Sequence, residues 1–247
     1  MNEQEQRVLR LRQAAQRASK LDRAVAGRFV TGEERALAVH EARGAGVTVS
    51  FDGGWPDAER VQVCFHPEGQ APEFTAQWVE ARWNARFASV EHRDLLGSLM
   101  GLGMDRELFG DLIAMEGRAL VYTLPEMALR LPMEWTQAGR ATLKVSVPDN
   151  PPVIEPPRGT LLRDTVASPR LDSVLSSGMR TSRSRAAEWI RQGLVMVDHS
   201  PEERVDRVLA PGQLISVRGF GRIRLTEVGQ PTRKDRLPVT LEVFSKA

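Results

Sequence analysis

The chain has 247 residues, of which 41% are hydrophobic and 27% charged, with a formal net charge of +2 and a pI of about 9.0. This ordinary globular composition comes with no apolar run near the roughly 18 residues of a membrane helix and no secretory signal at the N-terminus. Cys64 is the only cysteine, which excludes an intramolecular disulfide and a cysteine metal cluster, so we expect a reduced cytoplasmic protein of two or three domains without membrane association.

Residues 1–73 are predicted to form two helices followed by a β-hairpin. The second helix begins near Thr31, which can cap it together with Glu34 at the capping-box spacing. The sequence DGGWP then favours a turn between two strands, because glycine tolerates positive φ and proline fixes its own. The four elements are expected at residues 3–18, 31–43, 47–51 and 60–66.

The order of elements in residues 74–147 predicts a ferredoxin-like domain. A central hairpin turns at Glu116 and Gly117, and Pro125 is placed at the start of the second helix. The resulting order β-α-β-β-α-β is the split βαβ pattern. The six elements are expected at 74–83, 90–103, 108–115, 116–124, 125–135 and 140–147.

Residues 148–167 are predicted to be a stiff connector to a basic C-terminal domain at 168–247. The connector holds five of the chain's 15 prolines, which excludes a helix there. The following domain has twelve Arg and two Lys against nine Asp and Glu, a net charge of +5, whereas the rest of the chain has −3. This distribution favours an anionic partner for the C-terminal domain.

The basic domain is predicted to place two short helices on a small sheet. Gly178 ends the first helix, and Ser182 can cap the second. Arg183 and Arg185 then lie in the first helical turn, where the helix dipole disfavours cations but backbone N–H groups accept phosphate. Cations at that position indicate an external anion. In an unbroken strand, a second set of arginines would share one face, namely Arg218, Arg222 and Arg224.

In the stretches RLDSVL, SRSRAAEWIRQGLVMV and LAPGQLISVRGFGR, the chain resembles the S4 domain, an RNA-binding module of a ribosomal protein and of several RNA enzymes. This resemblance covers about residues 168–225. FDGGWPDAER at 51–60 and HRDLLGSLMGLGMDRELFGD at 92–111 resemble the N-terminal portion of the YlmH-type S4 proteins of bacteria. We therefore expect an α+β protein with N-terminal helices and a hairpin, a ferredoxin-like middle domain and a C-terminal S4 domain.

The S4 resemblance assigns RNA-binding roles to several side chains. Together with their neighbours, the residues expected to contact RNA are Arg170, Arg180, Ser182, Arg183, Arg185, Arg191, Arg218 and Arg222. Replacing Arg183 and Arg185 by Glu is predicted to abolish binding while leaving the fold intact. One departure concerns the turn after the second helix, where the family usually has Asn and a following Lys. This chain has Asp198 and Ser200 instead, which removes one phosphate contact.

The resemblance implies a non-catalytic protein that binds rRNA or tRNA on the large ribosomal subunit, in quality control of stalled subunits. No cofactor, metal or small-molecule substrate is expected. Two alternatives remain open: an RNA-modifying enzyme that uses the S4 domain as a targeting arm, and an interaction protein linked to cell division.

Several residues resemble catalytic or binding groups in isolation. Asp172 matches the Arg-Leu-Asp aspartate of pseudouridine synthases, but only 75 residues follow it, so we expect it to cap or brace the first S4 helix. HRD at 92–94 is predicted to start a helix, because no other kinase motif is present. The four histidines are too scattered for zinc, and Cys64 is expected in the core.

Two further features have open interpretations. The first 28 residues carry seven Arg and Lys against three acids, which fits a solvated helix face or a second RNA contact. The strands of the middle domain lack the paired aromatics that stack bases in RNA-recognition folds. Trp78 and Trp83 come nearest to them, and we expect at least one in the core.

Overall fold

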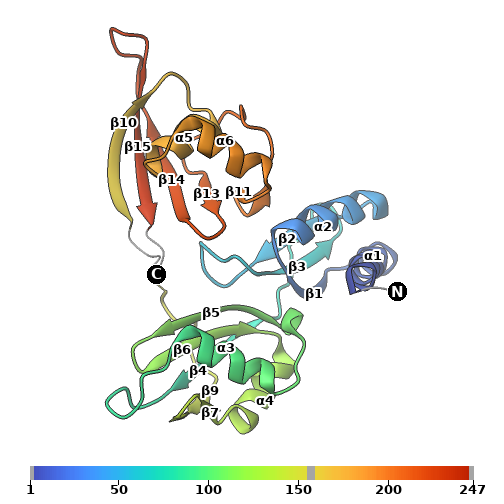
Figure 1. Cartoon of the computed structure of the whole chain (residues 1–247). Helices are drawn as coiled ribbons and strands as arrows, with labels where there is room; N and C mark the ends of the chain where they lie inside the picture. The colour runs from blue at the N-terminus through green and yellow to red at the C-terminus, as the bar shows by residue number, and fades with distance from the viewer. Residues whose placement is uncertain (1–2, 155–158, 245–247) are drawn as a thin grey trace. The chain divides into compact units, whose positions relative to one another are not determined.

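The computed structural model describes residues 3–154 and 159–244, and the chain divides into two compact units, Met1–Glu155 and Pro156–Ala247 (Figure 1). The first unit contains the N-terminal elements and the middle domain, and the second contains the basic domain. Both combine helices with antiparallel sheets. The α+β fold expected from the sequence is confirmed.

Two helices and a three-stranded sheet form the N-terminal part, α1 (Glu3–Leu21), α2 (Gly32–Ala45), β1 (Val25–Val30), β2 (Thr48–Asp52) and β3 (Val61–His66). The sheet order is β1-β3-β2. The capping box of α2 is present, because the Glu34 carboxylate accepts a hydrogen bond from the Thr31 backbone N–H at 2.7 Å. β1 was not predicted, since its short sequence contains Gly27 and pairs with a strand that lies more than 30 residues later.

The middle domain has the predicted ferredoxin-like topology, with the sheet order β5-β6-β4-β9. Its main elements are β4 (Gln77–Arg82), α3 (His92–Gly101), β5 (Phe109–Met115), β6 (Arg118–Thr123), α4 (Pro125–Glu134) and β9 (Lys144–Ser146). A short helix, η1 (Arg106–Leu108), precedes β5. The predicted last strand at 140–147 is split, because its first part forms β8 (Ala141–Thr142) and pairs with β7 (Gln137–Ala138).

The two faces of the middle sheet have different partners. α3 and α4 cover the face that carries Val79, Ala81 and Val121. Trp78 and Tyr122 lie on the opposite face, where they pack against Phe29 of β1. Ring centroids are 4.8 Å apart for Trp78 and Tyr122 and 5.7 Å apart for Phe29 and Tyr122. Trp78 is therefore a core residue, and aromatic contacts join the N-terminal part to the middle domain.

Asp111 of β5 binds the loop that connects β2 and β3. Its carboxylate accepts hydrogen bonds from the indole of Trp55 at 3.0 Å and from the backbone N–H groups of Glu59 and Arg60 at 2.9 and 3.0 Å. Arg106 instead donates to the carbonyl oxygens of Phe109 and Gly110, as expected of a residue that fixes the loop before β5. Burial lowers the pKa of Arg106 to about 10.

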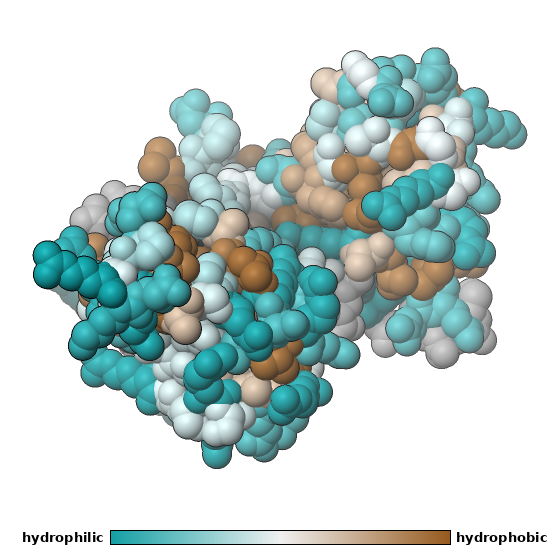
Figure 2. Space-filling view, turned by 90° about the horizontal axis from the view of Figure 1, so that it is seen from above, coloured by the Kyte–Doolittle hydropathy of each residue, from teal (hydrophilic) through white to brown (hydrophobic). Residues whose placement is uncertain are grey.

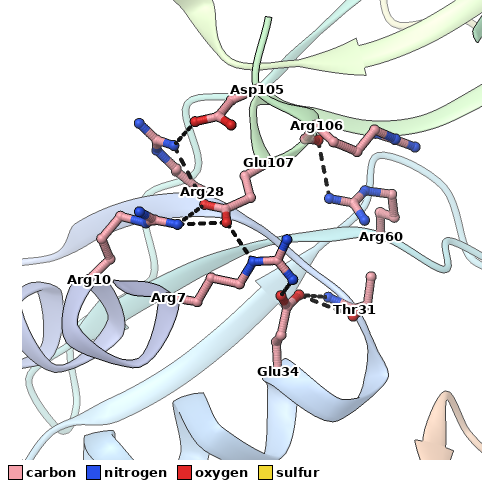
Figure 3. Close-up of polar contacts among 9 residues, drawn as sticks. All are labelled: Arg7, Arg10, Arg28, Thr31, Glu34, Arg60, Asp105, Arg106 and Glu107. Atoms are coloured by element: carbon pink, nitrogen blue, oxygen red, sulfur yellow. Dashed lines mark hydrogen bonds and ion pairs between the residues drawn. The ribbon is translucent and has the colours of Figure 1, made fainter. Parts of the chain in front are cut away.

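Glu107 gathers arginines from the N-terminal part (Figure 3). Arg7 and Arg10 of α1 donate to its carboxylate at 2.8 and 2.6 Å, and Arg28 of β1 lies 3.5 Å from it. Glu107 itself is buried, with 8% of its surface exposed. These three arginines of the basic N-terminus thus hold the fold together, and the solvated-face interpretation is wrong for them.

The second unit packs α5 (Leu171–Gly178) and α6 (Arg183–Arg191) on one antiparallel sheet with the order β10-β15-β14-β13-β11-β12. The strands are β10 (Thr160–Val166), β11 (Val195–Val197), β12 (Ser200–Pro201), β13 (Leu214–Val217), β14 (Gly221–Val228) and β15 (Leu237–Phe244). The predicted helices and the Gly219–Gly221 bend are present. β10 lies inside the stretch 148–167 that was predicted as a connector, because neighbouring prolines masked a strand whose partner, β15, follows about 75 residues later.

Candidate nucleic-acid interface

The start of α6 presents exposed arginines on an ordered turn. The Ser182 hydroxyl accepts a hydrogen bond from the Arg185 backbone N–H at 3.2 Å and so caps the helix. Arg183 and Arg185 are exposed, and no acidic residue lies in this first turn. Arg180 precedes the cap with a left-handed φ of 49°, a conformation that is unfavourable for a non-glycine residue. An anion bound here would meet three guanidinium groups and the free N–H groups of the helix end.

Asp172 fixes two of the predicted arginines. Its carboxylate accepts hydrogen bonds from Arg183 at 2.5 Å and from Arg170 at 3.2 Å. Burial of this carboxyl opposes its ionisation, but the hydrogen bonds from Arg183 and Arg170 outweigh burial and hold its pKa below the ordinary value. Asp172 is only 5% exposed. It therefore braces α5 against α6, as expected, and a substrate has no access to it as a nucleophile.

Arg185 is also held in place by aromatic rings. Its guanidinium lies 5.9 Å from the centroid of Trp189, and that ring lies 4.3 Å from the ring of Phe220. Phe220 belongs to the turn between β13 and β14, as does the exposed Arg218. This stack connects the surface of α6 with the β13–β14 turn. Trp189 and Phe220 were not predicted as site residues, although a Gly-Phe-Gly sequence next to arginines is a usable signal.

Three predicted site residues lie apart from the α6 surface. Arg218, Arg222 and Arg224 do not share a strand face, because the chain turns between β13 and β14. Ile223 and Leu225 point into the helix-covered core, so Arg222 and Arg224 lie on the opposite face of the sheet, near the Phe244 ring. Arg191 is exposed at the C-terminal end of α6, ~12 Å along the axis from Arg183. The helix dipole alone favours a cation there.

The turn between β11 and β12 keeps its geometry despite the change from Asn to Asp. Asp198 and His199 both have left-handed φ angles, 49° and 64°. The Asp198 carboxylate accepts hydrogen bonds from the Gln213 side chain at 2.7 Å and from the Leu214 backbone N–H at 2.9 Å. Ser200 follows in β12, so the contact of the usual lysine is missing while the turn itself is preserved.

A second buried carboxylate organises the loop beside α5. Glu202 is 7% exposed and accepts hydrogen bonds from the side chains of Arg204 and Arg207 at 3.1 and 2.6 Å. Although burial opposes ionisation, these bonds lower its pKa to about 2. The same loop accepts backbone hydrogen bonds from the first residues of α5, through the carbonyls of Val205 and Arg207. Sequence reasoning missed Glu202, because a glutamate in a charged loop gives no signal of burial.

Other candidate residues have structural roles. Cys64 is fully buried in β3, and burial raises the pKa of its thiol. The HRD sequence starts α3, where the Asp94 carboxylate accepts a hydrogen bond from the Glu91 backbone N–H at 3.0 Å. Among the described residues, no three His, Cys, Asp or Glu side chains are grouped as metal ligands. Within the same residues, no helix is long and apolar enough to span a membrane.

The surface beyond these arginines is mainly hydrophilic. On the face shown in Figure 2, hydrophobic residues occur in small groups among hydrophilic ones. A surface of this kind fits a charged partner better than a broad apolar one.

Comparisons with known proteins agree with this geometry. Residues 169–215 match the model of the S4 domain, and residues 69–150 match the model "Putative RNA-binding domain in YlmH". A Bacillus subtilis protein, "Ribosome-associated protein quality control protein P2", is 37% identical over 202 residues, which are 80% of this chain and 79% of that protein. The chain belongs to the YlmH family of S4-domain proteins.

One solved structure gives a weaker match to this YlmH family member. The "Cell division protein ylmH from Streptococcus pneumoniae" has a TM-score of 0.49 and 21% identity, and the match covers 60% of this chain and 93% of that one. The chain is thus an RNA-binding S4-domain protein, homologous to a ribosome-associated quality control protein.

Proposed function

We propose that this protein binds structured rRNA or tRNA on the large ribosomal subunit, without catalysing a reaction, and acts in quality control of stalled subunits. The observation that carries the proposal is the arginine surface at the start of α6, defined as Arg170, Arg180, Arg183 and Arg185. Arginine suits phosphate because its planar guanidinium donates two parallel hydrogen bonds. The printed name of the Bacillus subtilis relative supports the ribosomal setting.

The surface is organised before RNA arrives. Asp172 holds Arg170 and Arg183, and Trp189 supports Arg185, so fewer side-chain rotamers are lost on binding. The partial exposure of Arg170 and Arg183, 39% and 56% of their side chains, leaves donors free for phosphate. Phosphate contacts position the protein, and the shape of the RNA then supplies selectivity.

The brace changes the variant that tests the proposal best. Glu at position 183 would place a carboxylate against Asp172 and disturb the fold, so the expected intact fold of the Arg183/Arg185 variant is doubtful on physical grounds. Arg180→Glu with Arg185→Glu avoids this contact, because neither guanidinium binds Asp172. Arg163→Glu, at an exposed position of β10, is a matched control.

Filter binding of the full chain to purified large-subunit rRNA tests the proposal, with polyglutamate as the competing anion. We expect the Arg180/Arg185 variant to lose at least tenfold in affinity, the control to keep the wild-type affinity, and polyglutamate to compete weakly. Equal binding by both variants would refute the assignment of the surface. Strong competition by polyglutamate would instead indicate an acidic protein partner.

A further inference from the structure

A row of cations crosses the open part of the middle sheet. Arg82 of β4 is the direct cross-strand partner of Arg118 on β6 and of Lys144 on β9. Direct partners in antiparallel strands share a face, so three cations lie side by side there. Like charges in such pairs are destabilising. One buried carboxylate, Glu80, offsets part of this repulsion through ion pairs with Arg82 at 2.8 Å and Arg118 at 3.2 Å.

This row lies on the same face as the covered aromatic residues. Trp78, Glu80 and Arg82 alternate along β4 with Val79 and Ala81, which face the helices. Trp78 and Tyr122 are only 5% and 6% exposed, because the N-terminal part packs on them. The half of the face that could stack bases is therefore closed, and the half that remains open is cationic.

An open groove continues from this row around the ends of the strands. It has a volume of about 730 Å³, and Arg82, Arg86 and Lys144 line it against one carboxylate, Glu116. In the part of the chain that the structure describes, the side chains of Arg86 and Lys144 form no ion pair. Unpaired cations on two sides of a groove favour an extended polyanion over a single small anion.

An exposed aromatic ring stands next to the groove. Phe87 is 87% exposed, although apolar rings of this size are usually buried. Its position is ordered, because backbone hydrogen bonds from Phe87 and Ala88 to the Asn84 carbonyl form a turn, with distances of 3.1 and 3.3 Å. The Asn84 side chain also accepts a hydrogen bond from the Arg86 backbone N–H. A ring held out beside cations can stack an unpaired base.

We infer that the groove lined by Arg82, Arg86 and Lys144 binds single-stranded RNA, with phosphates on the cations and a base stacked on Phe87. The inference rests on the proposed RNA-binding function and adds a second contact surface to it. Single-stranded RNA fits better than duplex, because stacking on an aromatic side chain needs an unstacked base.

The test measures binding of the full chain to a fluorescent twelve-nucleotide oligouridylate by anisotropy, at several salt concentrations. Arg86→Glu with Lys144→Glu should weaken binding at least tenfold and lower the salt slope by about 2, one for each lost phosphate contact. Phe87→Ala should weaken binding about tenfold with an unchanged salt slope, because stacking releases no counterions. Arg130→Ala, at an exposed position of α4 on the other side of the sheet, should bind like wild type.

The Arg180/Arg185 variant separates this inference from the proposed function. If that variant loses rRNA binding while the groove variants bind oligouridylate like wild type, the S4 surface stands and the groove inference is overturned. If the groove variants lose oligouridylate and the S4 variant still binds rRNA normally, the groove stands and the S4 assignment fails. Competition by polyglutamate as strong as by RNA would also overturn the inference. Melting curves of the variants should match wild type, since all the substituted side chains are exposed or half-buried.

Discussion

Arg183 at the start of α6 donates a hydrogen bond to the Asp172 carboxylate in the first turn of α5. The two residues are 11 positions apart, and Arg170 binds the same carboxylate from the other side. The contact therefore joins the two helices and aims two arginines at once. It makes one aspartate important for both the stability of the second unit and its proposed binding surface.

Replacing Asp172 by Asn should lower both stability and affinity for RNA. The substitution removes two charge-assisted hydrogen bonds, which contribute roughly 1.5–3 kcal/mol each, and leaves the two arginines without a common anchor. We expect a loss of about 2 kcal/mol or more in the free energy of unfolding, measured by urea denaturation. Asp206→Asn, at an exposed position of the same unit, is the control and should change little. Wild-type stability in Asp172→Asn would show that the brace is unimportant.

Arg185→Ala and Arg191→Ala should have unequal effects on RNA binding. Arg185 lies in the first turn beside the cap, whereas Arg191 lies at the far end of the same helix. We expect Arg185→Ala to reduce affinity about tenfold and the salt slope by about 1, and Arg191→Ala to reduce affinity less than twofold. Titrations at several salt concentrations measure both quantities. The opposite order would move the binding surface to the C-terminal end of α6.

Glu202 makes the stability of the second unit depend on pH. Its folded pKa of about 2 lies below its ordinary value of 4.5. The group therefore stabilises the fold fully above about pH 4.5, and this contribution is lost as the pH falls towards 2. Glu202→Gln should lower the melting temperature at pH 7 and flatten its fall below pH 4.5. Melting curves of the two proteins that stay parallel from pH 7 to pH 3 would contradict this role.

Phe29 should be the residue whose truncation most weakens the contact between the N-terminal part and the middle domain. Its ring is 1% exposed and packs edge-on against Tyr122. A Cβ atom at Gly110 would lie 2.7 Å from its Cε1 atom. Phe29→Ala should cost about 3–5 kcal/mol, and Gly110→Ala should also destabilise the first unit by overpacking. Calorimetry that finds the first unit unchanged in both variants would disprove this packing.

Local patterns predicted most helices and the order of strands in the middle domain. Thr31 with Glu34, and Ser182 before Arg183, mark helix starts because capping depends only on residues three positions apart. β1 and β10 escaped prediction, since each is defined by pairing with a distant strand. The predicted site was correct for the arginines that follow Ser182, which lie on one helix. It was too broad for Arg222, because the turn at Gly219 reverses the strand and moves that side chain to the other face.

Buried charge was the other feature beyond the reach of the sequence. Glu107, Asp172 and Glu202 each gather two or more arginines, and nothing in their sequence neighbourhoods distinguishes them from solvated acids. Part of the basic excess is therefore used inside the fold. Counting charge along the chain overestimates the surface that is available to RNA.

Cosedimentation with ribosomal subunits tests the central claim most directly. Cell lysate is separated on a sucrose gradient, and the wild-type protein and the Arg180/Arg185 variant are located by blotting across the free, 30S, 50S and 70S fractions. The account predicts a wild-type peak on the 50S fraction that disappears in the variant and persists in Arg163→Glu. Wild-type protein found only in the free fractions, even at low salt, would contradict it.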